Sequence, residues 1–323
     1  MRLRLCFHDN CFDGAASAAL FTAFFRQREP AVEIRCRGLA HQPGGAVFPE
    51  GTFDGDLNAV VDFRYAADPR LTRWFDHHVS AFPSPADEAH FRADTSGQKF
   101  FDPKAPSCAR FLARTCAERF GFDLAPHREL VEWAEIIDGA FFPSAEMAVA
   151  LAEPGLRIMT WLESNRDSAL TQRLIARFAD GRPLGEIADE PWLKEPLGPL
   201  LERHARALAV LTRRTRLDDG VVTFDLTAEG LESYNKFIPY FLHPECRFVV
   251  GLTASRERVK ISVGSNPWRP RSAISIARIC ERYGGGGHPV VGAVSLPAGA
   301  LERGREVVAE IVRELQQAEP PRG

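Results

Sequence analysis

The chain has 323 residues, a length that accommodates two ordinary domains. Its content of 45% hydrophobic and 26% charged residues is that of a soluble globular protein and excludes a largely disordered chain. A formal net charge of −3 argues against a protein held on long duplex DNA by phosphate neutralisation, and favours a small anionic ligand.

Cysteine usage and apolar runs bear on where the protein works. The seven cysteines are odd in number, scattered and without a CxxC pair, which predicts reduced thiols in a cytoplasmic protein. Residues 1–12 reach His8 and Asp9 before an apolar stretch develops, so we expect no signal peptide. No apolar run approaches the roughly 18 residues that span a bilayer, so we expect no membrane partner.

The chain begins with a strand, a polar loop and a helix. Residues 2–7 predict a strand that stops at His8, and residues 15–25 are rich in good helix formers. The loop between them contains Asp13. Two polar side chains therefore follow the end of the first strand.

Two further strand patterns end on carboxylates. Residues 57–63 contain a buried-strand run, residues 59–61, that ends on Asp62, and residues 70–75 lead directly into Asp76. Strand ends are the usual place for ligands in an open α/β sheet. We therefore expect these polar residues to lie at one edge of such a sheet.

The middle of the chain has helical spacing. Apolar residues recur with a helical period over residues 107–120 and 130–137, and the second segment ends on Asp138. Residues 145–178 also predict helix. The four prolines within residues 180–200 predict the end of the first domain.

A second α/β domain is expected to begin near residue 216, after a long helix over residues 200–213. It is predicted to contain strands over residues 221–226, 247–253 and 259–263 and a helix over 274–283. A closing strand over 290–296 and a last helix over 301–317 are expected to follow. We expect a domain over residues 1–190, a linker and connecting helix over 191–215, and a second domain over 216–323.

Residues 284–287 are four glycines followed by His288, and we expect them to form a flexible loop. One interpretation is a mere connection. The other is an anion site, because glycines let backbone N–H groups approach a phosphate and His288 adds a donor. The second interpretation is favoured by a locally basic segment that includes Arg271.

Carboxylates and histidines at strand ends predict a metal centre. Hard divalent ions take carboxylate oxygens, and Mn²⁺ also accepts imidazole nitrogen, so this set favours Mn²⁺ over Mg²⁺. We expect Asp62 to bridge two ions because it alone ends a strongly buried run. Two ions about 3.5–4 Å apart would activate a shared water for attack on phosphorus, which predicts metal-dependent phosphoester hydrolysis.

Each candidate also has a structural interpretation, which is the more common one for a single residue. In this interpretation His8 is an ordinary loop residue and Asp13 is a helix cap or turn residue. Asp62 is then a cap, and Asp138 is a residue at a helix end. Residues 76–78 are harder to explain in this way. They place a carboxylate and two imidazoles after two aromatic residues, and such polar groups need partners if they are buried.

Two motifs carry a resemblance to a known family. Asp76-His77-His78 resembles the motif that names the DHH phosphoesterase superfamily, and Gly285-Gly286-Gly287-His288 resembles the signature of its associated C-terminal domain. The resemblance covers nearly the whole chain and is greatest to the bacterial oligoribonuclease and phosphoadenosine-phosphatase branch. It implies a parallel-sheet DHH domain, a smaller α/β C-terminal domain and an active site in the cleft between them.

The resemblance also implies roles for individual residues. The expected metal ligands are His8, Asp13, Asp62, His77 and Asp138. Asp76 and His78 are expected to orient the ligands and contact the phosphate, although direct coordination by Asp76 stays open. The expected substrate-binding residues are Gly285, Gly286, Gly287 and His288.

The first motif departs from the family pattern. Relatives commonly have two aspartates one residue apart, but here Cys11 stands two positions before Asp13. Three explanations are open: Asp9 substitutes from another position, Cys11 binds as a thiolate, or one metal site is weak or empty.

A second departure lies in the C-terminal domain. Many relatives carry a substrate-binding arginine where this chain has Gly264. Arg269 or Arg271 is the candidate to take its role.

Our preferred hypothesis is a phosphodiesterase, exonuclease or phosphatase that uses one or two ions of Mn²⁺ or Mg²⁺. Its expected partner is a short oligonucleotide or small nucleotide, and a homodimer is an open alternative to a monomer. An inorganic pyrophosphatase is a second hypothesis, against which the glycine-histidine segment counts. A nucleotide-binding or sensing protein with weakened catalysis is a third, and Cys11 keeps it open.

Overall fold

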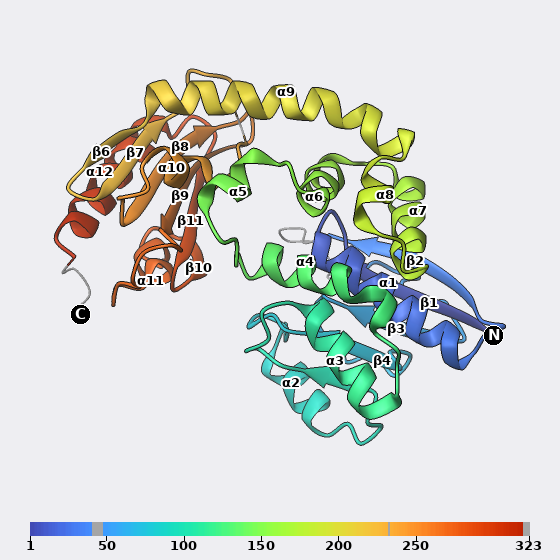
Figure 1. The fold of residues 1–323 in the computed structure, drawn as a ribbon. Helices are drawn as coiled ribbons and strands as arrows, with labels where there is room; N and C mark the ends of the chain where they lie inside the picture. Colours follow the sequence, from blue (N-terminus) through green and yellow to red (C-terminus); the bar gives the residue numbers. More distant parts are fainter. Residues whose placement is uncertain (41–47, 232, 319–323) are drawn as a thin grey trace. The chain divides into compact units, whose positions relative to one another are not determined.

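The computed structural model describes residues 1–40, 48–231 and 233–318. The chain forms two compact units, the first made of Met1–Phe142 and Ala152–Leu197 and the second of Pro143–Leu151 and Gly198–Gly323. Each unit is built around its own β-sheet (Figure 1). The predicted α/β class with a parallel sheet and a second sheet is confirmed.

Among the described residues, the sheet of the first unit has five strands, all parallel, in the order β2-β1-β3-β4-β5. Its strands are β1 (Arg2–His8), β2 (Glu33–Leu39), β3 (Leu57–Val61), β4 (Arg73–Asp76) and β5 (Lys99–Phe101). Because all the strands run in one direction, their carboxyl ends open on the same edge.

The central strands of this sheet are apolar because both of their faces are covered. Val60 and Trp74 pack on one side in a cluster with Tyr65, and the indole Nε1–H of Trp74 donates to the Phe63 carbonyl at 2.9 Å. Phe75 points to the other side. Its ring centroid lies 6.2 Å from that of Phe21 in helix α1 (Phe12–Arg28).

Helices surround this sheet. The others in the unit are α2 (Pro85–Arg92), α3 (Cys108–Phe120), α4 (Arg128–Asp138), α6 (Pro154–Ser164), α7 (Ser168–Ala179) and α8 (Leu184–Ala188). Helix α1 packs against β1 and β3 and also against α3, α4 and α7. Contact on so many sides explains why α1 is rich in alanine and buried over most of its length.

The continuous helix expected over residues 145–178 is instead three helices. The first, α5 (Ala145–Ala150), ends where Leu151 has a φ of 50°. Pro154 then begins α6, where a proline needs no N–H partner. The side chain of Asp167 begins α7 by accepting bonds from the N–H groups of Ala169 and Leu170.

The sheet of the second unit has six strands in the order β10-β11-β9-β8-β7-β6. They are β6 (Arg216–Asp218), β7 (Val221–Asp225), β8 (Phe248–Ala254), β9 (Arg258–Ser265), β10 (Gly286–His288) and β11 (Val291–Pro297). Only β7 and β8 are parallel, and the other pairs are antiparallel.

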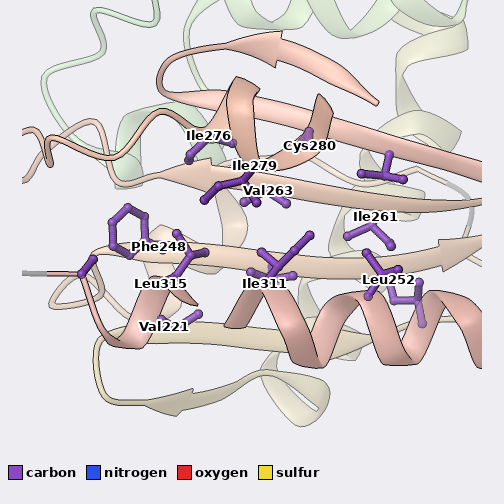
Figure 2. Packing of buried hydrophobic residues seen from close by; sticks show 14 of the residues in the cluster. Val221, Phe248, Leu252, Ile261, Val263, Ile276, Ile279, Cys280, Ile311 and Leu315 are labelled. Carbon is purple, nitrogen blue, oxygen red and sulfur yellow. The ribbon is translucent and has the colours of Figure 1, made fainter. Parts of the chain in front are cut away.

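One face of this sheet forms the core of the second unit. Its helices are α9 (Pro191–Arg214), which begins in the first unit, α10 (Ile238–Leu242), α11 (Ile276–Glu281) and α12 (Leu301–Gln316). Leu252 and Ile261 are paired across β8 and β9, so their side chains share a face. Ile311 of α12 and Ile279 of α11 belong to the same buried cluster, shown in Figure 2.

The second half of the glycine run, with His288, is a strand rather than part of the expected flexible loop. Residues 286–288 form β10, which pairs with β11. A Cβ atom at Gly285 would lie 2.2 Å from the carbonyl oxygen of Ala293, and one at Gly287 would lie 2.2 Å from that of Val291. Close backbone approach to β11 therefore requires glycine at these two positions.

Within the described ranges, no helix has the length and the apolar character needed to cross a membrane.

Candidate metal centre

The carboxyl edge of the parallel sheet gathers polar side chains. His8 is the last residue of β1, Asp62 follows β3 directly, and Asp76 is the last residue of β4. Asp13 lies in the first turn of α1, and Asp138 is the last residue of α4. These five positions are far apart in the sequence but come from neighbouring elements of the first unit.

Asp62 has an unusual backbone and an unusual side chain. Its φ is 56°, a left-handed conformation that costs a residue other than glycine about 1–3 kcal/mol. The carboxylate is 1% exposed, and neither oxygen has a hydrogen-bond partner among the described residues. Its Oδ2 lies 3.5 Å from His8 Nδ1 and its Oδ1 lies 3.5 Å from His77 Nε2. One carboxylate thus faces two histidines, one with each oxygen.

The Nε2 atom of His77 is the meeting point of three carboxylates. It lies 3.5 Å from Asp62 Oδ1, 3.7 Å from Asp13 Oδ2 and 3.5 Å from Asp138 Oδ2. It has no hydrogen bond within the described structure. Neighbouring atoms that bind one ion at about 2.1 Å lie ~3.0 Å apart with octahedral angles and ~3.4 Å apart with tetrahedral angles. The observed spacings therefore fit ligands around an ion better than they fit direct hydrogen bonds.

Asp13 is held in place by the start of another helix. Its two carboxylate oxygens accept bonds from the backbone N–H groups of Cys108, at 2.6 Å, and Ala109, at 2.9 Å. These donors belong to the first turn of α3, whose own cap is Ser107. The charge of Asp13 is stabilised by that helix end, and the carboxylate is turned toward His77.

Asp76 positions the histidine pair that follows it. Its Oδ1 accepts bonds from the backbone N–H of His77 at 2.8 Å and from Nδ1 of His78 at 2.7 Å. Asp76 is completely buried, whereas the His78 side chain is 31% exposed. Since Nδ1 of His78 donates to Asp76, the lone pair of that ring is on Nε2.

The described part of the chain contains three overlapping groups of potential ligand atoms. The atoms of each group lie within 4.8 Å of one another. The groups are His8, Cys11 and Asp62; Asp62, His77 and His78; and Asp13, His77 and Asp138. Asp62 and His77 each belong to two of them. The structure thus brings together all five expected metal ligands, with His78 beside them.

The concentration of negative charge shifts the ionisation of these groups. Burial, followed by Asp62 and Asp138, raises the pKa of Asp13 well above its ordinary value. Burial lowers the pKa of His77, but interactions with Asp62 and Asp13 outweigh burial and raise it. A divalent cation would supply the positive charge that several buried carboxylates require.

The alternative ligand Asp9 points elsewhere. A Cβ atom at Gly38 of β2 would lie 2.5 Å from the carboxyl carbon of Asp9. Asp9 therefore packs against β2, and it belongs to none of the three groups found among the described residues.

The predicted substrate-binding residues lie in the second unit. His288 and Arg271 are exposed, whereas Arg269 donates its Nε–H to the Pro244 carbonyl at 3.0 Å. A side chain would not fit at position 264 in this structure, because a Cβ atom at Gly264 would lie 2.4 Å from the hydroxyl of Tyr240.

Comparison with known proteins shows similarity at the level of fold. No family model and no curated protein matches the sequence. PggH, a pGpG-specific phosphodiesterase from Vibrio cholerae, matches with a TM-score of 0.64 and 20% identity, over 97% of this chain and 99% of that chain.

Two further solved structures match less closely. An exopolyphosphatase-related protein from Bacteroides fragilis gives a TM-score of 0.54 and 14% identity, over 98% of this chain and 92% of its own. Exonuclease RecJ bound to manganese gives 0.50 and 14%, over 97% of this chain and 90% of its own.

The chain therefore has the two-domain α/β fold of these three proteins, as the resemblance of residues 76–78 and 285–288 implies. The similarity does not single out one branch, so the likeness to the oligoribonuclease and phosphoadenosine-phosphatase branch stays a prediction.

Proposed function

We propose that the protein is a phosphoesterase that depends on divalent metal ions and hydrolyses short nucleotides. The observation that carries this proposal is the Asp62 carboxylate, which is buried, has no hydrogen bond among the described residues and faces a histidine with each oxygen. Such a carboxylate fits a bridge between two cations. The DHH fold supports the same chemistry.

The metal ligands of this proposal divide into two sets that share Asp62. His8 belongs to one set, and the other consists of Asp13, His77 and Asp138. Bound ions would lower the pKa of a water molecule and offset charge on the departing oxygen. Oxygen and nitrogen ligands of this kind suit Mn²⁺, and Mg²⁺ is the second choice.

Substrate contacts are proposed for residues next to the ligands and in the second unit. His78 is partly exposed, and its Nδ1–H is engaged by Asp76, so its Nε2 is the atom that would meet a phosphate oxygen. The backbone of Gly285–Gly287, the ring of His288 and the Arg271 guanidinium would bind the remaining phosphate charge. The exposure of His288 and Arg271 supports this role.

A linear dinucleotide is the first substrate to test. One solved structure that matches over nearly the full length of both chains is a pGpG-specific phosphodiesterase. The net charge of −3 favours a small anion over long nucleic acid. Nucleotides with a 3′-phosphate and the ends of very short RNA share the same phosphoester chemistry and belong to the same proposal.

The test is hydrolysis with added Mn²⁺ of a linear dinucleotide, a cyclic dinucleotide, a nucleoside 3′,5′-bisphosphate and pyrophosphate. Wild-type protein should cleave at least one nucleotide, and His77→Ala should cleave none. Cleavage of pyrophosphate alone would replace our proposal with a pyrophosphatase. Tight binding of a nucleotide without cleavage would replace it with a sensor.

A further inference from the structure

Cys11 occupies a fixed position beside the metal centre. It is the residue immediately before α1 and is half-buried. The preceding Asn10 has a φ of 55°, and its side-chain amide donates to the carbonyls of Leu162 and Asn165, at 3.3 and 2.9 Å. These bonds anchor the loop between β1 and α1, which carries Cys11.

The sulfur atom lies among groups that bind cations. Cys11 Sγ lies within 4.8 Å of ligand atoms of both His8 and Asp62. The Asp62 oxygen on this side, Oδ2, is buried and accepts no hydrogen bond among the described residues. A buried carboxylate of this kind needs a positive partner. This Asp62 oxygen therefore indicates a cation independently of the cysteine.

The two halves of the metal centre differ in their ligands. Around His77, two carboxylates besides Asp62 are available, namely Asp13 and Asp138. Around His8, the third ligand atom in the group is the Cys11 sulfur. Asp9, the other candidate, faces Gly38 instead. Among the described residues, the group around His8 and Asp62 therefore reaches three protein ligands with the Cys11 sulfur.

We propose that Cys11 binds the ion held by His8 and Asp62, as a thiolate, so that the two metal positions have different ligand chemistry. This inference rests on the proposed metal centre. Binding forms one metal–sulfur bond and releases the thiol proton to solvent. Thiolate favours Zn²⁺, Co²⁺ or Fe²⁺ and disfavours Mg²⁺, whereas the Asp13, His77 and Asp138 side remains suited to Mn²⁺ or Mg²⁺.

The test is a titration of the reduced, metal-free full chain with Co²⁺ in the absence of air. Wild type should develop a near-ultraviolet absorption band from charge transfer between thiolate and cobalt. The band should disappear in Cys11→Ser and Cys11→Asp. Cys36→Ser is the matched control, because Cys36 is also partly exposed and belongs to no ligand group in the described chain, and it should keep the band.

The Cys11→Asp variant separates loss of a thiolate from loss of the site. It should bind as many ions as wild type, without the band, because a carboxylate replaces the sulfur. Cys11→Ala should bind cobalt at this position at least about 10-fold more weakly. Identical spectra in wild type and Cys11→Ser would overturn the inference, as would stoichiometric cobalt binding by wild type without the band.

A second measurement needs no variant. Alkylation of the wild-type protein, followed by peptide mass spectrometry, should show Cys11 protected by Zn²⁺ and reactive after chelation, with Cys36 equally reactive in both. Equal alkylation of Cys11 under both conditions would contradict the inference. The proposed function can fail independently of this inference. If the protein develops the cobalt band but cleaves no nucleotide, the thiolate ligand is supported and the phosphoesterase activity is contradicted.

Discussion

The Nδ1 atom of His77 lies 2.9 Å from the carbonyl oxygen of Ala105. A carbonyl can only accept a hydrogen bond, so Nδ1 carries the proton and donates it. The lone pair of the ring is then on Nε2, the atom that faces Asp13, Asp62 and Asp138. A backbone carbonyl in this place fixes the tautomer and the orientation that metal binding needs.

Replacing His77 by alanine should lower phosphoesterase activity by more than about 100-fold, because even residues that only orient a ligand contribute about 10- to 100-fold. Initial rates at saturating Mn²⁺ measure the effect. The matched control is His90→Ala: that histidine is exposed on α2 and contacts Tyr65, so its variant should retain wild-type rates. Comparable rates in wild type and the His77 variant would remove the metal centre from the mechanism.

Replacing Asp62 by asparagine should affect both metal positions, whereas replacing Asp138 should affect one. The reason is that Asp62 belongs to the ligand groups of both His8 and His77, and Asp138 only to that of His77. Counting bound ions by elemental analysis after dialysis tests this difference. Equal losses in the two variants would show that Asp62 is not a bridge.

Asp13 should matter for stability as well as for metal binding. Asp13→Ala removes the acceptor for two buried N–H groups of α3, and unsatisfied buried donors cost about 1–3 kcal/mol. Asp13→Asn removes the same charge but keeps one acceptor oxygen. Urea unfolding in the presence of chelator should therefore find the alanine variant less stable than the asparagine variant. The opposite order would mean that the two hydrogen bonds to α3 do not stabilise the fold.

Gly14 should not tolerate a methyl group. A Cβ atom there would lie 2.1 Å from the backbone oxygen of His8, which cannot move without shifting β1 or α1. Gly14→Ala should cost about 1–3 kcal/mol and weaken ion binding at the adjacent ligands. Gly198→Ala on α9 is the control: nothing lies within 4 Å of its Cβ position, so it should gain about 0.5–1 kcal/mol. Thermal unfolding of both variants and of wild type measures these changes in stability.

His127 should make the fold sensitive to acid. Burial lowers the pKa of its ring below the ordinary value of 6.5, and the ring stacks on Phe122. As the pH falls below 6.5, the unfolded chain takes up this proton before the folded one does, so stability falls. Above pH 6.5 the effect is absent. When the pH is lowered from above 6.5 to below 6.5, His127→Phe should lose less stability than wild type. Urea unfolding at the two pH values measures the free energy of unfolding. Parallel losses would exclude His127 as a cause.

Elements with strong apolar patterns were predictable from the sequence. The strand over residues 2–7 and the helix over 107–120 are present as β1 and α3. They were predictable because burial on both faces of a parallel strand, or along one side of a helix, produces a regular pattern of apolar residues in the sequence. Strand β2 was not predicted. Its Glu33, Arg35 and Arg37 alternate with partly buried residues at the edge of the sheet, and such a pattern is easily taken for a loop.

The candidate site was predictable in part. Asp62 and His77 stood out because polar groups follow buried runs, and the structure brings them together. Cys11 could not be assigned from the sequence, since its role depends on a position fixed by Asn10 and distant carbonyls. The effect of Tyr240 on Gly264 was equally hidden, because it is a contact between separate elements.

The division of the chain has a consequence for proteolysis. The backbone passes from one unit to the other three times, after residues 142, 151 and 197. A cut after residue 197 therefore leaves residues 143–151 of the second unit on the fragment that carries the first unit. Moreover, a fragment that starts at residue 198 lacks Ala148 and Val149, whose carbonyls accept bonds from Asn235 and His204. The second unit is thus a folded body that no continuous stretch of the gene encodes.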